Sequence, residues 1–346
     1  MIKEAIAALV ENKDLTYEEA YFVMGEIMSG EATPVQIAAF LTALRIKGET
    51  PDEIAGLASV MRSRATPVKT NGPALDIVGT GGDGSGSFNI STAAAFVAAG
   101  AGLKVAKHGN RAMSSHCGSA DILEALGVKI DLNADGVEEC LNKVGMGFMF
   151  AQVFHPAMKH AAPVRREMGI RTVFNILGPL TNPAGVEHLL LGVASEEVGH
   201  KIAAVLHRLG VKHALVVYGK DGLDEVSLGG KTIVWEVTAD KSPAVREIAP
   251  ENFGIKSVKN ADIKGGTPQE NAEKLEKILD GEKSDLRSAV VINAAAALIA
   301  GNVTADMKEA ARIAGETIDT GLAKDILERL VVLSQGIGRR DEQHPG

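Results

Sequence analysis

The chain has 346 residues, of which 45% are hydrophobic and 23% are charged, and this composition is globular and excludes disordered and fibrous classes. A formal net charge of −8 argues against general affinity for nucleic acid or anionic membranes, so an anionic ligand would need a local basic cluster. Acids near the start argue against a signal peptide, no uncharged stretch reaches membrane-spanning length, and two cysteines without metal spacing suit a reducing cytoplasm.

The first sixty-odd residues predict only helices. Capping boxes begin at Thr16, Thr33 and Thr50, and a proline follows the last two at the first helical position. We therefore predict a small all-helical domain over residues 1–70, ending in a linker with proline and glycine. Its apolar faces indicate core packing. Because four short helices enclose little core, part of this surface is also a candidate contact with a second subunit.

From residue 71 onward, strand-like and helix-like segments alternate. Strands are predicted at residues 74–80, 103–109, 188–194, 213–219 and 231–237, and helices at 89–102, 119–127, 196–210 and along the tail from 267. Such alternation is typical of a mainly parallel sheet covered by helices. The predicted fold class is therefore α/β, with a large domain over residues 71–346 whose central sheet is flanked by helices.

A glycine-rich stretch, DIVGTGGDGSGSFNIST, joins the first predicted strand to the first helix of this domain. It contains G-x-G-x-x-G at Gly79, Gly81 and Gly84, but the helix begins after the glycines and no acid ends the next strand, so a dinucleotide site is not indicated. Ser85 stands where a Walker P-loop needs lysine. Glycines allow close approach of backbone N–H groups, so the stretch predicts a loop that holds an anion, most often phosphate.

A polar segment follows the second predicted strand. It reads KHGNRAMSSHCGS and carries the positive charges of Lys107, His108 and Arg111. Loops that follow parallel strands emerge at the same sheet edge, where ligands bind, and Ser91 and Thr92 lie at a helix N-terminus that favours anions. The two loops are therefore predicted to form one site. Three further histidines are interpreted as structural: His116, His155 and His160.

Five motifs in chain order, GTGGD, NIST, KHGNR, HPAMKHAAPVRREMGIRTVFNILGPLTNP and DGLDE, resemble the anthranilate phosphoribosyltransferase family. The resemblance covers nearly the whole chain, and KHGNR separates it from related nucleoside phosphorylases of the same architecture. It implies transfer of the 5-phosphoribosyl group from phosphoribosyl pyrophosphate to the amine of anthranilate, the second step of tryptophan biosynthesis from chorismate. It also implies a homodimer formed through the helical domain, and the two cysteines agree with a cytoplasmic location.

The resemblance also implies site residues. Anthranilate would lie near Gly79, Asn110 and Arg165, and Mg²⁺, expected as two ions per subunit, would be held by Ser91, Asp224 and Glu225. Phosphoribosyl pyrophosphate would be bound by Gly79, Gly82, Asp83, Ser87, Asn89, Ile90, Ser91, Thr92, Lys107, His108, Gly109, Asn110, Arg111, Ala112, Met113, Ser114, Ser115 and Ser119. Ser87 is a departure, because threonine is expected there, but the hydroxyl is kept.

The chemistry agrees with these residue types. Displacing pyrophosphate from a ribose carbon builds negative charge on the leaving group, which needs hard cations and aligned donors. Carboxylates and a hydroxyl suit Mg²⁺, and an arginine can bind a carboxylate through two parallel N–H bonds. No residue is assigned as nucleophile, acid or base, so direct transfer is expected. A pyrimidine nucleoside phosphorylase and a non-catalytic nucleic-acid-binding relative remain as alternatives, and the net charge argues against the second.

Overall fold

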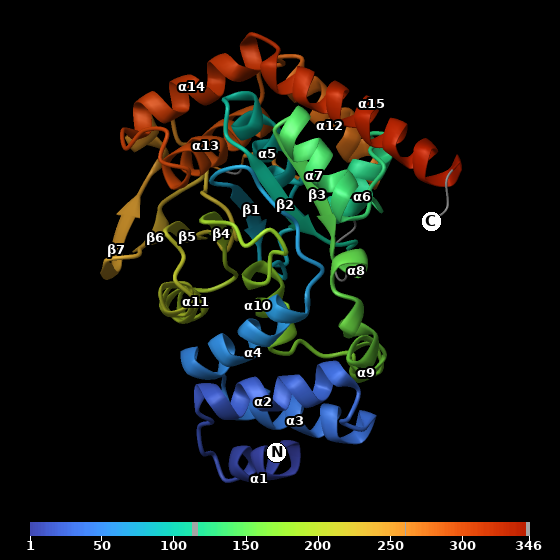
Figure 1. Cartoon of the computed structure of the whole chain (residues 1–346). Coiled ribbons are helices and arrows are strands. Elements are labelled where there is room, and N and C mark those ends of the chain that lie inside the picture. The colour runs from blue at the N-terminus through green and yellow to red at the C-terminus, as the bar shows by residue number, and fades with distance from the viewer. Residues whose placement is uncertain (113–116, 260, 344–346) are drawn as a thin grey trace.

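The computed structural model describes residues 1–112, 117–259 and 261–343. It contains a small group of N-terminal helices beside a large domain in which helices cover a single sheet (Figure 1). The predicted fold class is confirmed. The predicted site residues Met113, Ser114 and Ser115 lie outside the described residues, as does His116, which was interpreted as structural.

The small domain is built from four helices: α1 (Ile2–Val10), α2 (Tyr17–Ser29), α3 (Pro34–Lys47) and α4 (Pro51–Arg64). All three predicted capping boxes are present, with threonine side chains accepting from the third helical residue. α2 ends at Gly30, whose φ of 79° is the left-handed conformation expected of a helix-terminating glycine. Local sequence signals therefore mark where α2, α3 and α4 begin and where α2 ends.

The sheet has seven strands in the order β3-β2-β1-β4-β5-β6-β7. β1 to β5 are parallel, whereas β6 and β7 are antiparallel to their neighbours. The strands are β1 (Leu75–Gly79), β2 (Val105–Gly109), β3 (Met146–Phe150), β4 (His188–Gly192), β5 (His213–Gly219), β6 (Thr232–Thr238) and β7 (Lys241–Ile248). The chain moves outward in one direction from β1 to β3 and in the other from β4, so the topology reverses between β1 and β4.

The remaining helices cover the sheet and its ends. The small-residue helix α5 packs against β1 and against the buried α13, and α15 packs across α5 (Figure 1). This group comprises α5 (Ile90–Gly100), α6 (Ser119–Ala125), α7 (Ala134–Lys143), α11 (Glu196–Arg208), the 3-10 helix η3 (Pro250–Phe253), α12 (Pro268–Leu279), α13 (Asp285–Ala300), α14 (Met307–Asp319) and α15 (Leu322–Gln343).

One segment of the large domain leaves the sheet after β3 and packs on the small domain (Figure 1). It contains α8 (Ala151–Phe154), η1 (Pro156–His160), α9 (Ala162–Met168), α10 (Phe174–Leu177) and η2 (Gly178–Leu180). Arg62 Nε of α4 donates to the backbone oxygen of Leu180 at 2.6 Å, and the Thr66 N–H donates to the backbone oxygen of Phe154 at 2.9 Å. The two parts of the molecule are thus connected through residues far apart in sequence.

Candidate active site

A cavity of about 690 Å³ opens where the sheet topology reverses. Its walls come from the loop after β1, the loop after β2, the segment between β3 and β4, and the loop after β5. Ligands of open α/β sheets bind beyond the carboxyl ends of the strands at such a reversal. Met61 of α4 also lines the cavity, so the small domain contributes to its wall.

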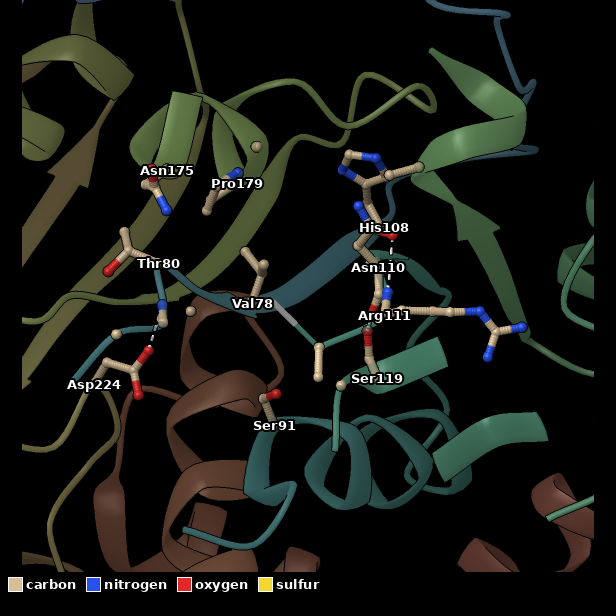
Figure 2. Close-up of a pocket in the computed structure, with 18 of the residues that line it drawn as sticks. Val78, Thr80, Ser91, His108, Asn110, Arg111, Ser119, Asn175, Pro179 and Asp224 are labelled. Carbon is tan, nitrogen blue, oxygen red and sulfur yellow. Dashed lines mark hydrogen bonds between the residues drawn. The ribbon is translucent and has the colours of Figure 1, made fainter. Parts of the chain in front are cut away.

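Two glycines on neighbouring strands leave the space that Asp224 occupies. Gly79 at the end of β1 pairs with Gly192 at the end of β4. A Cβ at Gly192 would overlap the backbone of Asp224, and a Cβ at Gly79 would overlap its carboxylate. The bare backbone therefore admits the loop after β5, and the Gly81 N–H donates to Asp224 Oδ2 at 2.8 Å (Figure 2).

Three carboxylates gather at this end of the cavity. Burial and the neighbouring Asp83 raise the pKa of Asp224 to about 6, and burial and Asp224 raise the pKa of Glu225 well above its usual value. Asp83 Oδ2 is buried and has no hydrogen-bond partner among the described residues. The Ser91 N–H, at the start of α5, donates to Glu225 Oε1 at 3.1 Å. Such mutually repelling oxygens are suited to a cation.

Lys107 lies beneath this acidic end rather than in its open space. Its side chain is buried, and its ammonium donates to the backbone oxygen of Ile77. Burial lowers the pKa of Lys107, whereas the nearby charges of Asp76 and Glu225 raise it. Asp76 accepts from Asn182 Nδ2 at 2.7 Å and from the His108 N–H at 3.3 Å. The lysine charge is thus positioned to balance buried acids.

Arg111 lines the cavity, but its guanidinium points away from the centre (Figure 2). Its nitrogens contact Asp121 at 3.0 Å and Glu124 at 2.8 Å, both on α6, and these acids raise the pKa of Arg111. Asn110 and Ser119 lie on the cavity side, and the Arg111 N–H donates to Asn110 Oδ1 at 2.8 Å. In this arrangement the loop presents hydrogen-bonding groups more than free charge.

A second part of the cavity lining, here called the aromatic end, includes Phe174. The Arg165 guanidinium lies over the Phe174 ring, 4.7 Å from its centre, and burial lowers the pKa of this arginine. Arg166 also lines the cavity but is exposed. The rings of His108 and His155 lie 5.0 Å apart, and burial lowers the pKa of His108 to about 3 and that of His155 to about 4. Both imidazoles are therefore neutral at pH 7.

Comparison with known proteins shows which family the chain resembles. Residues 3–65 match the helical bundle domain of a glycosyl transferase family, and residues 71–324 match the α/β domain of the same family. Anthranilate phosphoribosyltransferases from Dehalococcoides mccartyi and Chloroflexus aggregans are each 56% identical to it, covering 97% of this chain and 99% of theirs. This chain belongs to the anthranilate phosphoribosyltransferase family.

Solved structures of the family have the same architecture. The anthranilate phosphoribosyltransferase of Thermus thermophilus superposes with a TM-score of 0.90 at 47% identity, covering 96% of this chain and 99% of that one. The Saccharomyces cerevisiae enzyme, solved in complex with PRPP and Mg, gives 0.89 at 30% identity, covering 97% of this chain and 98% of that one.

Every described residue assigned from the family resemblance lines this one cavity, including Ser87, Arg165 and the Asp224–Glu225 pair. The roles of these residues stay predictions. His155, which was interpreted as structural, also lines the cavity, and several other lining residues were not predicted, among them Met61, Lys159, Phe174, Asn175, Gly178, Pro179 and Thr181. Most belong to the long motif that starts at His155, so that motif could have identified them as site residues. Nothing in the sequence distinguishes Met61 from an ordinary core residue of a helix.

The donor set for a metal is small. Within the described ranges, no group of three or more His, Cys, Asp and Glu side chains is placed to hold a metal ion. Asp224, Glu225 and the Ser91 hydroxyl are oxygen donors of the kind that Mg²⁺ prefers, and Mg²⁺ in such sites keeps waters and binds substrate phosphates. The raised pKa values of both acids fit a site whose charge is balanced when a cation is bound.

In the part of the chain that the structure describes, no helix is long and apolar enough to cross a bilayer.

Proposed function

We propose that this chain transfers the 5-phosphoribosyl group of phosphoribosyl pyrophosphate to the amine of anthranilate. The products are N-(5-phosphoribosyl)anthranilate and pyrophosphate, in the second step of tryptophan biosynthesis from chorismate. The observation that carries the proposal is the cavity itself, which gathers every described site residue assigned from the family resemblance at the reversal of the sheet. It has an acidic end for metal and phosphates and a partly aromatic end for the acceptor.

At the acidic end, phosphoribosyl pyrophosphate is held by the glycine-rich loop and by hydroxyl groups. The loop after β1 supplies Gly82 and Asp83, and the first turn of α5 supplies the Ser91 and Thr92 hydroxyls at the positive end of a helix. The loop after β2 completes the site with Asn110 and Ser119 side chains. Charge balance favours Mg²⁺ here, since the ammonium of Lys107 is already engaged beneath the acids.

Ser91, Asp224 and Glu225 would hold the metal, which we expect as two ions per subunit. Bound Mg²⁺ would neutralise charge that develops on the departing pyrophosphate. Asp83 is suited to hydrogen bonds with sugar hydroxyls or metal-bound water, because one of its oxygens is buried without a partner among the described residues.

At the aromatic end, Arg165 would bind the anthranilate carboxylate. A guanidinium that packs on the Phe174 ring is restricted in position and can present two parallel N–H bonds. This would direct the anthranilate amine toward the ribose. The neutral His108 and His155 offer a polarisable wall without a competing charge. We assign no residue as nucleophile, acid or base.

The assembly we propose is a homodimer that forms through the helical domain. Support comes from large apolar side chains exposed there, with Phe22 56% exposed, Val35 78% and Ile46 82%. We also propose a cytoplasmic location, consistent with Cys117 and Cys140, which are both unpaired and buried.

The test is loss of anthranilate fluorescence after addition of phosphoribosyl pyrophosphate and Mg²⁺. The loss of fluorescence should require the protein, phosphoribosyl pyrophosphate and Mg²⁺ together, and it should stop on chelation of the metal. A parallel reaction with uridine and inorganic phosphate checks the alternative of a pyrimidine nucleoside phosphorylase. Release of uracil without consumption of anthranilate would replace the proposed function with that alternative.

A further inference from the structure

A segment just before α12 pairs with the glycine-rich loop. The Phe88 N–H donates to the backbone oxygen of Ile263 at 2.8 Å, and the Gly265 N–H donates to that of Gly86 at 2.8 Å. Ser87 and Lys264 form an antiparallel bridge between these bonds. We call residues 263–266 the strap. Within the described residues, no part of the strap lines the cavity, so it acts on the loop from behind.

Asn271 of α12 connects this strap to both phosphate-site loops. Its side chain is buried, with 1% exposure. Asn271 Oδ1 accepts from the Gly266 N–H at 2.7 Å, and Asn271 Nδ2 donates to Asn89 Oδ1 at 2.9 Å. Asn89 Nδ2 in turn donates at 3.1 Å to the backbone oxygen of Cys117, which lies in the loop between β2 and α6. One amide thus joins three chain segments that are distant in sequence.

We propose that Asn271 is a positioning residue for phosphoribosyl pyrophosphate, which holds Asn89 and the strap so that both phosphate-site loops keep their binding geometry. It acts through Asn89, which lines the cavity and directly precedes α5, whereas Asn271 itself does not line the cavity. The inference rests on the proposed function, because the ligand is the substrate proposed above.

Asn271 accepts one hydrogen bond through its oxygen and donates another through its nitrogen, so the role requires an amide. Asn271→Asp keeps the acceptor for Gly266 but replaces the donor to Asn89 with an oxygen. Asn89 then either faces a carboxylate with its own oxygen or reverses its amide and loses Cys117. A buried polar group left unpaired costs more than the bond itself contributes, so the geometry of Asn89 should not survive this nearly isosteric change.

The experiment measures, by calorimetry with Mg²⁺ present, the affinity for phosphoribosyl pyrophosphate in the parent and in Asn271→Asp. It also measures KM for anthranilate and the thermal midpoint. Leu275→Ala is the control, because Leu275 is fully buried one turn further along α12 and makes no polar contact with either loop. We expect Asn271→Asp to weaken phosphoribosyl pyrophosphate binding about tenfold and to change the anthranilate KM less than about twofold. Leu275→Ala should lower the thermal midpoint and leave both substrates nearly unaffected.

A second variant tests the same arrangement if Asn271→Asp does not fold. A Cβ at Gly265 would lie 2.7 Å from the backbone oxygen of Ser87, so Gly265→Ala should push the strap off the loop and also weaken phosphoribosyl pyrophosphate binding. The inference is overturned if a folded variant binds phosphoribosyl pyrophosphate as tightly as the parent. It is also overturned if Leu275→Ala loses affinity in the same proportion to its loss of thermal stability. A parent that binds no phosphoribosyl pyrophosphate overturns the proposed function together with the inference.

Discussion

At the scale of single residues, two adjacent arginines line the same cavity in different surroundings. Arg165 lies over Phe174 and is partly buried, whereas Arg166 is exposed. Arg165→Ala removes a charge-assisted contact worth roughly 1.5–3 kcal/mol, so the KM for anthranilate should rise about ten- to a hundredfold. The KM for phosphoribosyl pyrophosphate should change much less. Steady-state kinetics on Arg166→Ala provide the control, and an effect on anthranilate confined to that variant would reverse the assignment.

The acidic pair gives a second prediction at this scale. Asp224→Asn combined with Glu225→Gln removes two oxygen donors with little change of shape, so turnover should fall about a hundredfold or more. The fold should persist, because neutral amides are easier to bury than the repelling carboxylates they replace. Mg²⁺ with pyrophosphate should raise the thermal midpoint of the parent but not that of the double variant. Full activity in the double variant would remove these residues from the mechanism.

The buried histidines predict how stability depends on pH. A folded His155 stays neutral down to about pH 4, whereas the unfolded one takes up a proton below about 6.5, so falling pH favours unfolding between these values. His155→Gln should remove this contribution, which is up to about 1.4 kcal/mol per pH unit. The free energy of unfolding should then fall less steeply in the variant from pH 6.5 to 4. Parallel curves for variant and parent would contradict the assigned burial.

Motif residues could be predicted as a set from the sequence, but the directions of their side chains could not. Arg111 was predicted to bring positive charge to the phosphates, yet its guanidinium contacts Asp121 and Glu124. Those acids lie ten and thirteen residues further along, on a helix whose position depends on the whole fold. Lys107 likewise could not be placed beneath the site without knowing that Asp76 and Glu225 are buried beside it.

At the scale of elements, the glycine-rich loop contains two glycines with similar backbone conformation that serve as test and control. Gly82 and Gly84 have φ values of 74° and 71°, so an added methyl group strains the backbone similarly at both. A Cβ at Gly82 would also overlap the guanidinium of Arg171 in the cavity, whereas a Cβ at Gly84 meets no described atom within 4 Å. Gly82→Ala should therefore weaken phosphoribosyl pyrophosphate binding more than Gly84→Ala, with anthranilate binding less affected. Calorimetry giving equal affinities for the two variants would show that strain alone matters.

The sequence predicted five of the seven strands, and the two it missed have physical reasons. β3 reads MGFMF, a short apolar run without alternation, which does not distinguish a buried strand from a helix. β7 is polar, largely exposed and contains Pro243, which is tolerated because this strand lies at the edge of the sheet. The capping boxes of the small domain, by contrast, are local signals, and all three were confirmed.

At the scale of the whole molecule, the proposed dimer predicts a change of mass. The parent should sediment with twice the mass of one chain, and Phe22→Glu combined with Ile46→Glu should shift it toward a single chain, because a buried interface does not tolerate unpaired charge. Val245→Glu is the control, since Val245 is 54% exposed on the edge strand β7 of the other domain. A parent that sediments as a single chain would exclude the dimer.

The contact between Arg62 and Leu180 has a consequence for the order in which the chain folds during its synthesis. The four N-terminal helices leave the ribosome first, but α8 to η2, which pack on them, follow about a hundred residues later. Domains usually fold as units from the N-terminus, whereas here the first unit must wait for part of the second. Until residue 180 has emerged, the face of α4 that meets this segment stays uncovered. A chaperone that holds nascent chains would find an exposed target there until then.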